Sequence, residues 1–388
     1  MASPNLDTVR KDISGTDKQL LELLAKRRQL SMEVAKSKLA SSKPVRDTTR
    51  EQQLLVELIE TGKSLQLDAP YVTQVFHSII EDSVLLQQAY LQQHINPDTI
   101  AHKVRVAFLG QQGSYSHLAA QKYFARKAEE VIEHGCKTFK EVIGKVENGL
   151  ADYALLPIEN TSSGGINEVY DLLQHTSLHI VGEVSVPVEH CLLVATATSE
   201  EKIKTIYSHF QPIAQCSEYL SHLPEVAIER TDATSHAFEI VANMARDDVA
   251  AIGNADGGRL YGLTAIRTGL ANQKQNYSRF IVVARKPIDV AEQIPAKTTF
   301  IMSVKQRPGA LVDALIILKQ NNINMCKLES RPIPGNPWEE MFYVDVESNV
   351  SSSNLITAME QLNDITTFIK ILGCYPSDDI SPTEPVVD

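Results

Sequence analysis

The chain has 388 residues, a formal net charge of −11 and ordinary fractions of apolar, aromatic and charged residues. This length suffices for two or three domains, and the negative charge argues against nucleic acid or an anionic membrane surface as a general partner. The five cysteines lack the paired spacing of a zinc or redox site, the first residues lack a signal-peptide core, and no apolar run is long enough to span a membrane. These features predict a cytoplasmic protein.

The first block, residues 1–95, predicts an all-α domain. Three helices are expected over about 5–40, 48–62 and 70–93, with breaks at 41–44 and 68–70. The first helix would be about 50 Å long. Since two shorter helices cannot cover both of its ends, we expect a second copy of the chain to do so.

Two further blocks follow. Residues 104–286 alternate strand-like and helical stretches, which is typical of an α/β fold. Residues 297–376 predict the order βαββαβ, a ferredoxin-like α+β unit. Residues 377–388, rich in Asp, Ser and Pro, are expected to be a disordered tail. The prediction is therefore a multidomain chain.

One charge interrupts the apolar stripe of the first helix. Leu23, Arg27 and Leu30 share the spacing of one helix face, so the Arg27 guanidinium is expected among apolar residues. A buried guanidinium needs an anion, which either the protein or a ligand supplies. Arg27 could thus fix helix register or hold a ligand. Lys38, eleven residues further on, returns to almost the same face.

Other polar side chains of the helical block sit at positions that can share one pocket. They are Asp47, Arg50, Glu51, Ser83 and Gln87. Arg10 lies about 25 Å from Arg27 along the first helix and can join that pocket only from a partner chain. Taken singly, each could be solvated helix surface. Together they predict a pocket for a small anion with two carboxylates.

Four segments of the α/β block place small polar residues where a strand ends and a helix could begin. They are 110–116, 159–165, 231–235 and 256–258. Helix N-termini with small hydroxyl side chains bind carboxylates or phosphates, although helix capping alone explains any one of them. Several such turns at one sheet edge predict a cleft for a compact anion. The glycine spacing of the first is wrong for a dinucleotide fingerprint.

The helical block resembles the all-helical family of chorismate mutases. The resemblance rests on 10–11, 24–28, 34–38, 44–47, 50–51 and 81–84 with Gln87. It implies an intertwined dimer whose first helix is shared by two active sites, and a pericyclic rearrangement of chorismate to prephenate. It also implies roles for individual residues. Arg27 and the partner's Arg10 would bind the carboxylates, and Lys38 and Gln87 would face the ether oxygen. Glu51 and Asp47 would bind the ring hydroxyl and neighbouring cations. Arg50 and Ser83 would line the rest of the pocket.

The α/β block resembles prephenate dehydratase. The resemblance rests on the segments 106–110, 113–117, 157–164, 207–209, 215–216, 233–235 and 276–280. The resemblance implies two α/β lobes with the site between them, no metal or organic cofactor, and loss of carbon dioxide and water from prephenate to give phenylpyruvate. The expected donor to the leaving hydroxyl is Ser278, where the family usually has Thr.

The same resemblance implies a set of prephenate-binding residues. They are Asn160, Thr161, Ser162, Ser208, His209, Gln215, Asp232, Thr234, Ser278, Arg279 and Phe280. Phe210 and Asp232 stand where the family commonly has Pro and Glu. The role of His209 therefore stays open between substrate contact and a structural hydrogen bond.

The βαββαβ block resembles an ACT domain, a small-ligand sensor. The resemblance rests on 307–312, which opens the first helix of the block, and on 329–332. It implies L-phenylalanine as allosteric inhibitor, bound between paired domains. The implied regulatory residues are Gly309, Ala310, Leu311, Val312, Glu329, Ser330, Arg331 and Pro332. A structural role is the alternative for Arg331.

Together the three resemblances cover nearly the whole chain. They imply a bifunctional enzyme of L-phenylalanine biosynthesis, both isomerase and lyase, that acts as a homodimer or higher oligomer and is feedback-inhibited by L-phenylalanine. The rival hypothesis is a non-catalytic amino-acid sensor, since a two-lobed cleft followed by an ACT unit could bind small acids without converting them. The complete set of mutase positions and the segment 278–280 argue against that rival.

Overall fold

The computed structural model describes residues 6–41, 43–99, 102–125, 127–223, 225–333, 335–336 and 339–378. These form two compact units, one from the described residues of 1–99 and 289–295 and the other from those of 100–288 and 296–378. Most of the tail predicted to be disordered, from residue 379 onward, lies outside the described residues. Over the described ranges, no helix combines the length and the apolar character needed to cross a membrane.

The helical unit contains the three predicted helices. They are α1 (Leu6–Leu39), α2 (Thr48–Ser64) and α3 (Ala69–Ile95), followed by a 3-10 turn at Pro97–Thr99. The predicted ends are confirmed to within two residues. Asp47 and Asp68 cap α2 and α3, because each carboxylate accepts a hydrogen bond from a backbone N–H of the first turn, at 3.0 and 2.9 Å.

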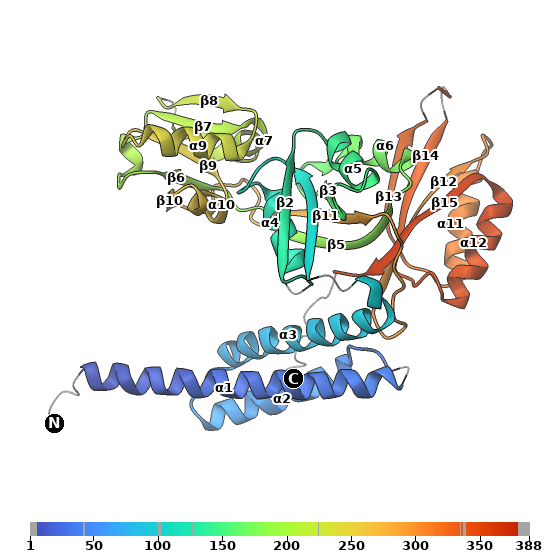
Figure 1. Cartoon of the computed structure of the whole chain (residues 1–388), viewed down its shortest axis with the longest axis horizontal. Coiled ribbons are helices and arrows are strands. Elements are labelled where there is room, and N and C mark those ends of the chain that lie inside the picture. Colours follow the sequence, from blue (N-terminus) through green and yellow to red (C-terminus); the bar gives the residue numbers. More distant parts are fainter. Residues whose placement is uncertain are drawn as a thin grey trace. The chain divides into compact units, whose positions relative to one another are not determined.

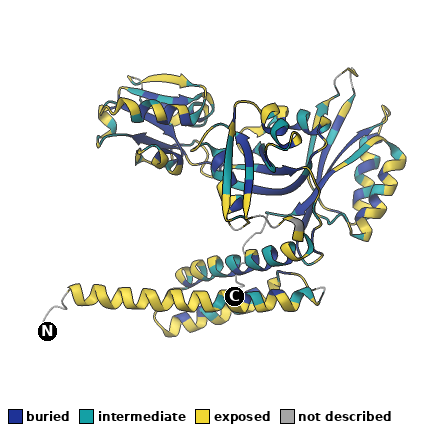
Figure 2. Cartoon of the chain, viewed as in Figure 1, coloured by how far each residue is buried: buried dark blue, intermediate teal, exposed yellow. Residues whose placement is uncertain are grey.

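The apolar stripe of α1 is exposed in a single chain. Residues 6–26 are exposed throughout, as Figure 2 shows. Leu23 and Leu30 are 63% and 58% exposed, whereas Ser31 and Ala35 are the buried residues of α1. The apolar stripe predicted around Arg27 is therefore not buried in a single chain. Arg27 itself is partly buried, and it lies four residues before Ser31 and eight before Ala35, on the same side of the helix.

The first lobe of the second unit is a mixed sheet with the strand order β2-β1-β3-β11-β5, with β4 paired to β3 (Figure 1). Its strands are β1 (Lys103–Leu109), β2 (Glu130–Cys136), β3 (Tyr153–Asn160), β4 (Gly164–Gly165), β5 (His179–Pro187) and β11 (Tyr277–Ala284). Its helices are α4 (Tyr115–Phe124), α5 (Phe139–Glu147) and α6 (Asn167–His175). The strand β11 is antiparallel to both neighbours, β3 and β5.

The second lobe is a sheet of order β10-β6-β9-β7-β8. Its strands are β6 (Cys191–Val194), β7 (Thr205–His209), β8 (Ala227–Thr231), β9 (Val249–Gly253) and β10 (Thr264–Arg267). Its helices are η2 (Glu200–Lys202), α7 (Phe210–Gln215), α8 (Ser217–Ser221), α9 (Thr234–Met244) and α10 (Ala255–Leu260). The chain therefore crosses between the lobes twice, after β5 and before β11.

Residues 296–376 form a four-stranded antiparallel sheet of order β13-β14-β12-β15. The elements are β12 (Ala296–Val304), α11 (Ala310–Gln320), β13 (Met325–Pro332), β14 (Glu340–Val346), α12 (Ser353–Ile365) and β15 (Thr366–Pro376), in the expected βαββαβ order. Figure 1 shows α11 and α12 beside one face of this sheet, where both helices contribute buried side chains to one core.

A cluster of six charged side chains, which we call the charge cluster, joins this sheet to the first lobe. Its members are Glu159, Glu183, Arg279, Lys297, Lys327 and Asp345. Arg279 on β11 lies 2.7 Å from both Glu183 and Asp345. Lys327 on β13 pairs with Glu159 on β3. Because a buried charge is tolerated only when it is paired, these contacts fix the two sheets against each other.

Candidate functional sites

The helical unit holds two partly buried cations on one face of α1. The Arg27 guanidinium donates to the Ile79 carbonyl at 3.1 Å and to the Ser83 hydroxyl, both on α3. The Lys38 ammonium donates to the Val45 carbonyl. Burial lowers the pKa of Arg27 and of Lys38 from their ordinary values. Each cation thus donates to neutral oxygens, and a nearby anion would stabilise it further.

A buried amide and a buried carboxylate complete this interior. Gln87, one turn beyond Ser83, is buried, and its Oε1 has no hydrogen-bond partner among the described residues. An unpaired buried oxygen costs free energy and marks a place where a ligand can bind. Glu51 is also buried and accepts from the Arg46 guanidinium at 3.1 Å. Arg46 was not among the residues predicted for this site from the sequence.

The remaining predicted mutase residues lie at the surface of the single chain. Arg10 is 69% exposed and lies 3.8 Å from Asp7, and Arg50 is 61% exposed and 3.9 Å from Glu57. Asp47 serves as the cap of α2. One chain therefore buries Arg27, Lys38, Glu51, Ser83 and Gln87 at least in part, and leaves Arg10 and Arg50 exposed.

In the α/β unit, strand register brings Asn160 and Ser278 together. They are direct partners in the antiparallel pairing of β3 with β11. The Asn160 Oδ1 accepts from the backbone N–H groups of Ser162 and Ser163, at 3.0 and 2.9 Å. Because a backbone N–H can only donate, the orientation of the Asn160 amide is determined. Its Nδ2 then donates to the Ser278 hydroxyl at 3.0 Å.

Gln215 and Thr161 extend this pair into a polar cluster. The Gln215 Nε2, at the end of α7 in the second lobe, lies 3.3 Å from the Ser163 hydroxyl and 3.5 Å from Asn160 Oδ1. The Thr161 hydroxyl accepts from the backbone N–H of Tyr277 at 2.9 Å. Since Ser278 already accepts a hydrogen bond from Asn160, its own hydroxyl hydrogen remains available to a bound molecule.

Four other predicted residues lie at the carboxyl ends of β7 and β8. Ser208 is fully buried and donates to a backbone carbonyl of β9 at 3.1 Å, so it stabilises the sheet. His209 caps α7 and accepts from a backbone N–H at 3.4 Å. Burial lowers the pKa of His209, although Asp232 opposes that shift. Asp232 is exposed, and Thr234 is the first residue of α9.

Arg279 and Phe280 do not join Ser278. Arg279 directly follows Ser278 and so points to the opposite face of the sheet, because successive side chains of a strand alternate. Arg279 points into the charge cluster and also donates to the Tyr375 hydroxyl at 3.0 Å. Phe280 is 2% exposed and belongs to the core of the first lobe. Both side chains therefore support the strand that carries Ser278 rather than contact its hydroxyl.

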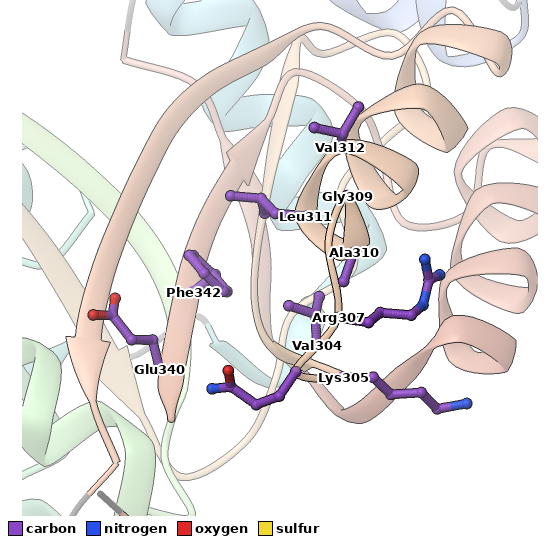
Figure 3. Close-up of a pocket in the computed structure, with 10 residues that line it drawn as sticks. Val304, Lys305, Arg307, Gly309, Ala310, Leu311, Val312, Glu340 and Phe342 are labelled. Atoms are coloured by element: carbon purple, nitrogen blue, oxygen red, sulfur yellow. The ribbon is translucent and has the colours of Figure 1, made fainter. Parts of the chain in front are cut away.

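A pocket of about 270 Å³ lies beside the start of α11. Gly309, Ala310, Leu311 and Val312 line it, together with Phe342 and other residues. Figure 3 shows the side chains of Leu311 and Phe342 close to each other and that of Arg307 directed away from them. Gly309 adopts a φ of +81°, which favours glycine.

The second segment predicted to be regulatory, 329–332, does not line this pocket. It lies on β13, an edge strand of the four-stranded sheet. Arg331 forms two hydrogen bonds of 2.9 Å with the carboxylate of Asp171 on α6. This pairing favours the structural alternative for Arg331, because both its Nε and one terminal nitrogen are occupied.

All five cysteines are free, and four of them are buried. Within the described ranges, no three His, Cys, Asp or Glu side chains come together as metal ligands would. The residues gathered at the sites above are amides, hydroxyls and cations, which suit the binding of organic anions.

Comparison with known proteins defines the class to which these folds and sites belong. The chorismate mutase type II family matches residues 9–88, and the prephenate dehydratase family matches residues 106–288. A bifunctional chorismate mutase/prephenate dehydratase of Escherichia coli K12 is 54% identical over 386 residues, which is 99% of this chain and 100% of that protein. The chain belongs to the family of bifunctional chorismate mutase/prephenate dehydratases.

Two solved structures resemble more than two thirds of the chain. Prephenate dehydratase from Arthrobacter aurescens, in complex with L-Phe, is 26% identical with a TM-score of 0.64, covering 73% of this chain and 92% of that one. GqqA, described as a quorum quenching acylase, is 30% identical with a TM-score of 0.63, covering 71% and 98%. Both support one fold for the α/β and βαββαβ parts together.

Proposed function

We propose that this protein converts chorismate to prephenate within residues 1–95 and prephenate to phenylpyruvate within residues 104–286, with residues 297–376 as an ACT regulatory domain. The dehydratase proposal rests on the Asn160–Ser278 pair, because the hydroxyl hydrogen of Ser278 is free to donate to a bound molecule. Conversion of chorismate to phenylpyruvate by the purified protein, followed by absorbance, tests both steps. The free cysteines agree with a cytoplasmic location.

The mutase proposal follows from the chemistry of a pericyclic rearrangement. This reaction uses no nucleophile and no proton transfer, so catalysis comes from holding the reactive conformer and stabilising charge on the ether oxygen. Arg27 would bind a carboxylate, and Lys38 and Gln87 would face the ether oxygen. The proposal is supported by the partial burial of both cations and by the unpaired oxygen of Gln87.

We also propose that two chains share α1 in an intertwined dimer. The proposal is supported by the exposed stripe of α1, because large apolar side chains along one helix face are normally covered by another surface. It is further supported by Arg10, which lies 17 residues before Arg27 and so about 25 Å from it along the helix. In a dimer, Arg10 can reach the site of the partner chain.

The dehydratase step needs a group that helps the ring hydroxyl to leave. The ring carboxylate departs as carbon dioxide, the electrons of the broken C–C bond enter the ring, and the hydroxyl departs with its bonding pair. We infer that Ser278 donates a hydrogen bond to that departing oxygen. Asn160 strengthens the donor, because a hydroxyl that accepts one hydrogen bond donates another more strongly.

Acylase activity, which the description of GqqA names, is less well supported for this chain. A serine nucleophile is activated by an adjacent general base. Among the described residues, the side chain that hydrogen-bonds to Ser278 is the amide nitrogen donor of Asn160. An amide N–H cannot accept the proton of a serine hydroxyl. The geometry therefore favours a hydroxyl that donates to a leaving group.

For regulation, we propose that L-phenylalanine binds in the pocket beside α11. The first turn of α11 offers backbone N–H groups to its carboxylate. Leu311 and Phe342 offer apolar surface to its ring, and Glu340, which also lines the pocket, offers a carboxylate to its ammonium group. The dehydratase from Arthrobacter aurescens was solved with L-Phe, which supports this assignment.

The role of Lys38 predicts a pH dependence. Burial lowers the pKa of Lys38 from 10.5, so its positive charge is lost at a lower pH than that of a free lysine. We expect kcat/KM for chorismate to fall on the alkaline side with an apparent pKa below 10.5. Lys38→Arg should remove this fall from the accessible pH range, because the guanidinium stays charged.

Lys38→Ala should lower mutase turnover about 100-fold or more, whereas the exposed control Lys36→Ala should not. An alkaline profile shared by the wild type and Lys38→Arg would contradict the assignment.

The shared-helix dimer predicts complementation. Arg10→Ala and Arg27→Ala should each abolish mutase activity. When equal amounts of the two variants are denatured, mixed and refolded together, about a quarter of wild-type activity should return. Half of the dimers then contain one chain of each variant, and each such dimer has one intact site out of two. Activity that stays at the level of the single variants would exclude a site built from two chains.

Ser278→Ala should lower dehydratase kcat by about 100-fold or more, because it removes the proposed hydrogen-bond donor. Ser278→Thr retains the hydroxyl and should keep turnover within about tenfold of wild type. Mutase turnover of the same preparations serves as the internal control. Wild-type dehydratase turnover in Ser278→Ala would remove this residue from the mechanism.

The regulatory proposal predicts that L-phenylalanine lowers dehydratase activity of the wild type. Gly309→Ala should lose this response, because a side chain at a φ of +81° strains the turn that opens α11. The matched control is Gly149→Ala, which places the same strain at a φ of +71° in another turn. Equal inhibition of both variants would contradict a ligand site at Gly309.

A further inference from the structure

A histidine outside every motif of the sequence analysis lies between the two lobes. His190 is 1% exposed and belongs to the segment that joins β5 to β6. Its carbonyl accepts from the backbone N–H of Leu270, in the returning segment between β10 and β11, at 3.0 Å. The two crossing segments are also joined by the backbone N–H of Val188 and the carbonyl of Asn276, at 2.7 Å. His190 is therefore fixed where the lobes meet.

The two ring nitrogens of His190 contact one residue from each lobe. The His190 Nε2 lies 2.7 Å from Oε1 of Gln215, in the second lobe. The His190 Nδ1 lies 3.3 Å from the hydroxyl of Tyr115, in the first lobe. The two rings meet edge to face, with centroids 6.0 Å apart. A hydrogen-bonded chain thus runs from Tyr115 through His190 to Gln215, which borders Asn160.

The backbone determines which way this chain of hydrogen bonds runs. Asn160 Oδ1 is an acceptor, because it receives two backbone N–H groups. The Gln215 atom that faces it at 3.5 Å must then be the amide nitrogen, since two acceptor oxygens would repel each other. The carbonyl oxygen of Gln215 consequently faces His190. The His190 Nε2 must carry a hydrogen and donate it.

The other nitrogen of His190 is then an acceptor in the neutral ring. The Tyr115 hydroxyl lies 3.3 Å from that nitrogen, and its single hydrogen is shared with the nearer Glu189 carbonyl, which accepts it at 2.9 Å. Burial lowers the pKa of His190, which keeps the ring neutral, and raises the pKa of Tyr115, which keeps its hydroxyl protonated. His190 therefore has a defined tautomer, with the hydrogen on Nε2.

We propose that His190 is a positioning residue of the dehydratase site, which holds the Gln215 amide so that its N–H groups face the Asn160–Ser278 pair and the substrate. The inference rests on the dehydratase activity proposed above. Without the His190 donor, the long contacts with Asn160 and Ser163, at 3.5 and 3.3 Å, would alone orient the Gln215 amide, and a rotated amide would present its oxygen to the cluster. That oxygen would face Asn160 Oδ1 and would repel a carboxylate of the bound dianion.

The test compares variants that remove or retain the donor. His190→Leu removes it, and His190→Gln retains an amide N–H near the position of Nε2. We expect dehydratase kcat to fall about tenfold or more in His190→Leu and to stay within about threefold of wild type in His190→Gln. Tyr115→Phe keeps the ring packing, removes the hydroxyl and should give an intermediate loss. Thermal unfolding of each variant reports on folding.

A double-mutant cycle separates positioning from general structural support. If His190 acts through Gln215, His190→Leu should cost no further kcat in a Gln215→Ala background, and neither should Tyr115→Phe. Losses that multiply in the double variants would overturn the proposal, as would equal kcat in His190→Leu and His190→Gln. If His190→Leu unfolds, the Tyr115→Phe cycle carries the same test.

The wild-type assay distinguishes the two levels of inference. A wild-type protein that converts prephenate while His190→Leu matches its kcat would overturn the positioning role alone. A wild-type protein that leaves prephenate unchanged would overturn the proposed dehydratase activity and, with it, this inference.

Discussion

The antiparallel register of β3 and β11 is the constraint on which the α/β unit depends. It sets Asn160 opposite Ser278 and, one residue further, Glu159 opposite Arg279. Because side chains alternate along a strand, the amide–hydroxyl pair and the charged pair occupy different faces. A slip of one residue would exchange the two faces and leave the Arg279 guanidinium without its carboxylates. The polar cluster and the charge cluster are therefore set by the same ladder of backbone hydrogen bonds.

In the helical unit, small side chains rather than register create the candidate site. Ser31 and Ala35 are the buried residues between Arg27 and Lys38 on α1. Their size lets α3 approach α1 closely, so that Arg27 can reach the Ile79 carbonyl across the gap. The large apolar side chains of α1 stay exposed in one chain. Within one chain the helix thus buries small side chains and leaves its large apolar side chains uncovered.

Local signals predicted most of the fold. Periodicity and breaks located the three helices to within two residues, and the order of the βαββαβ elements followed from strand and turn patterns. Pairings between residues far apart in the sequence could not be predicted from local patterns. The partners of Arg279 include Asp345, 66 residues away, and no local pattern points to it. His190 was missed because a single histidine before a strand carries no spacing signal. The periodicity of α1 did not show that its apolar stripe is exposed within one chain.

The charge cluster has a consequence for exchanging parts between related chains. The first lobe contributes Glu159, Glu183 and Arg279, two negative charges and one positive, for a net of −1. The four-stranded sheet contributes Lys297, Lys327 and Asp345, for a net of +1. Glu183 and Lys297 are almost fully buried, so neither charge can be satisfied by water. A chimaera that grafts a foreign sheet onto this lobe must therefore carry the complementary cations with it.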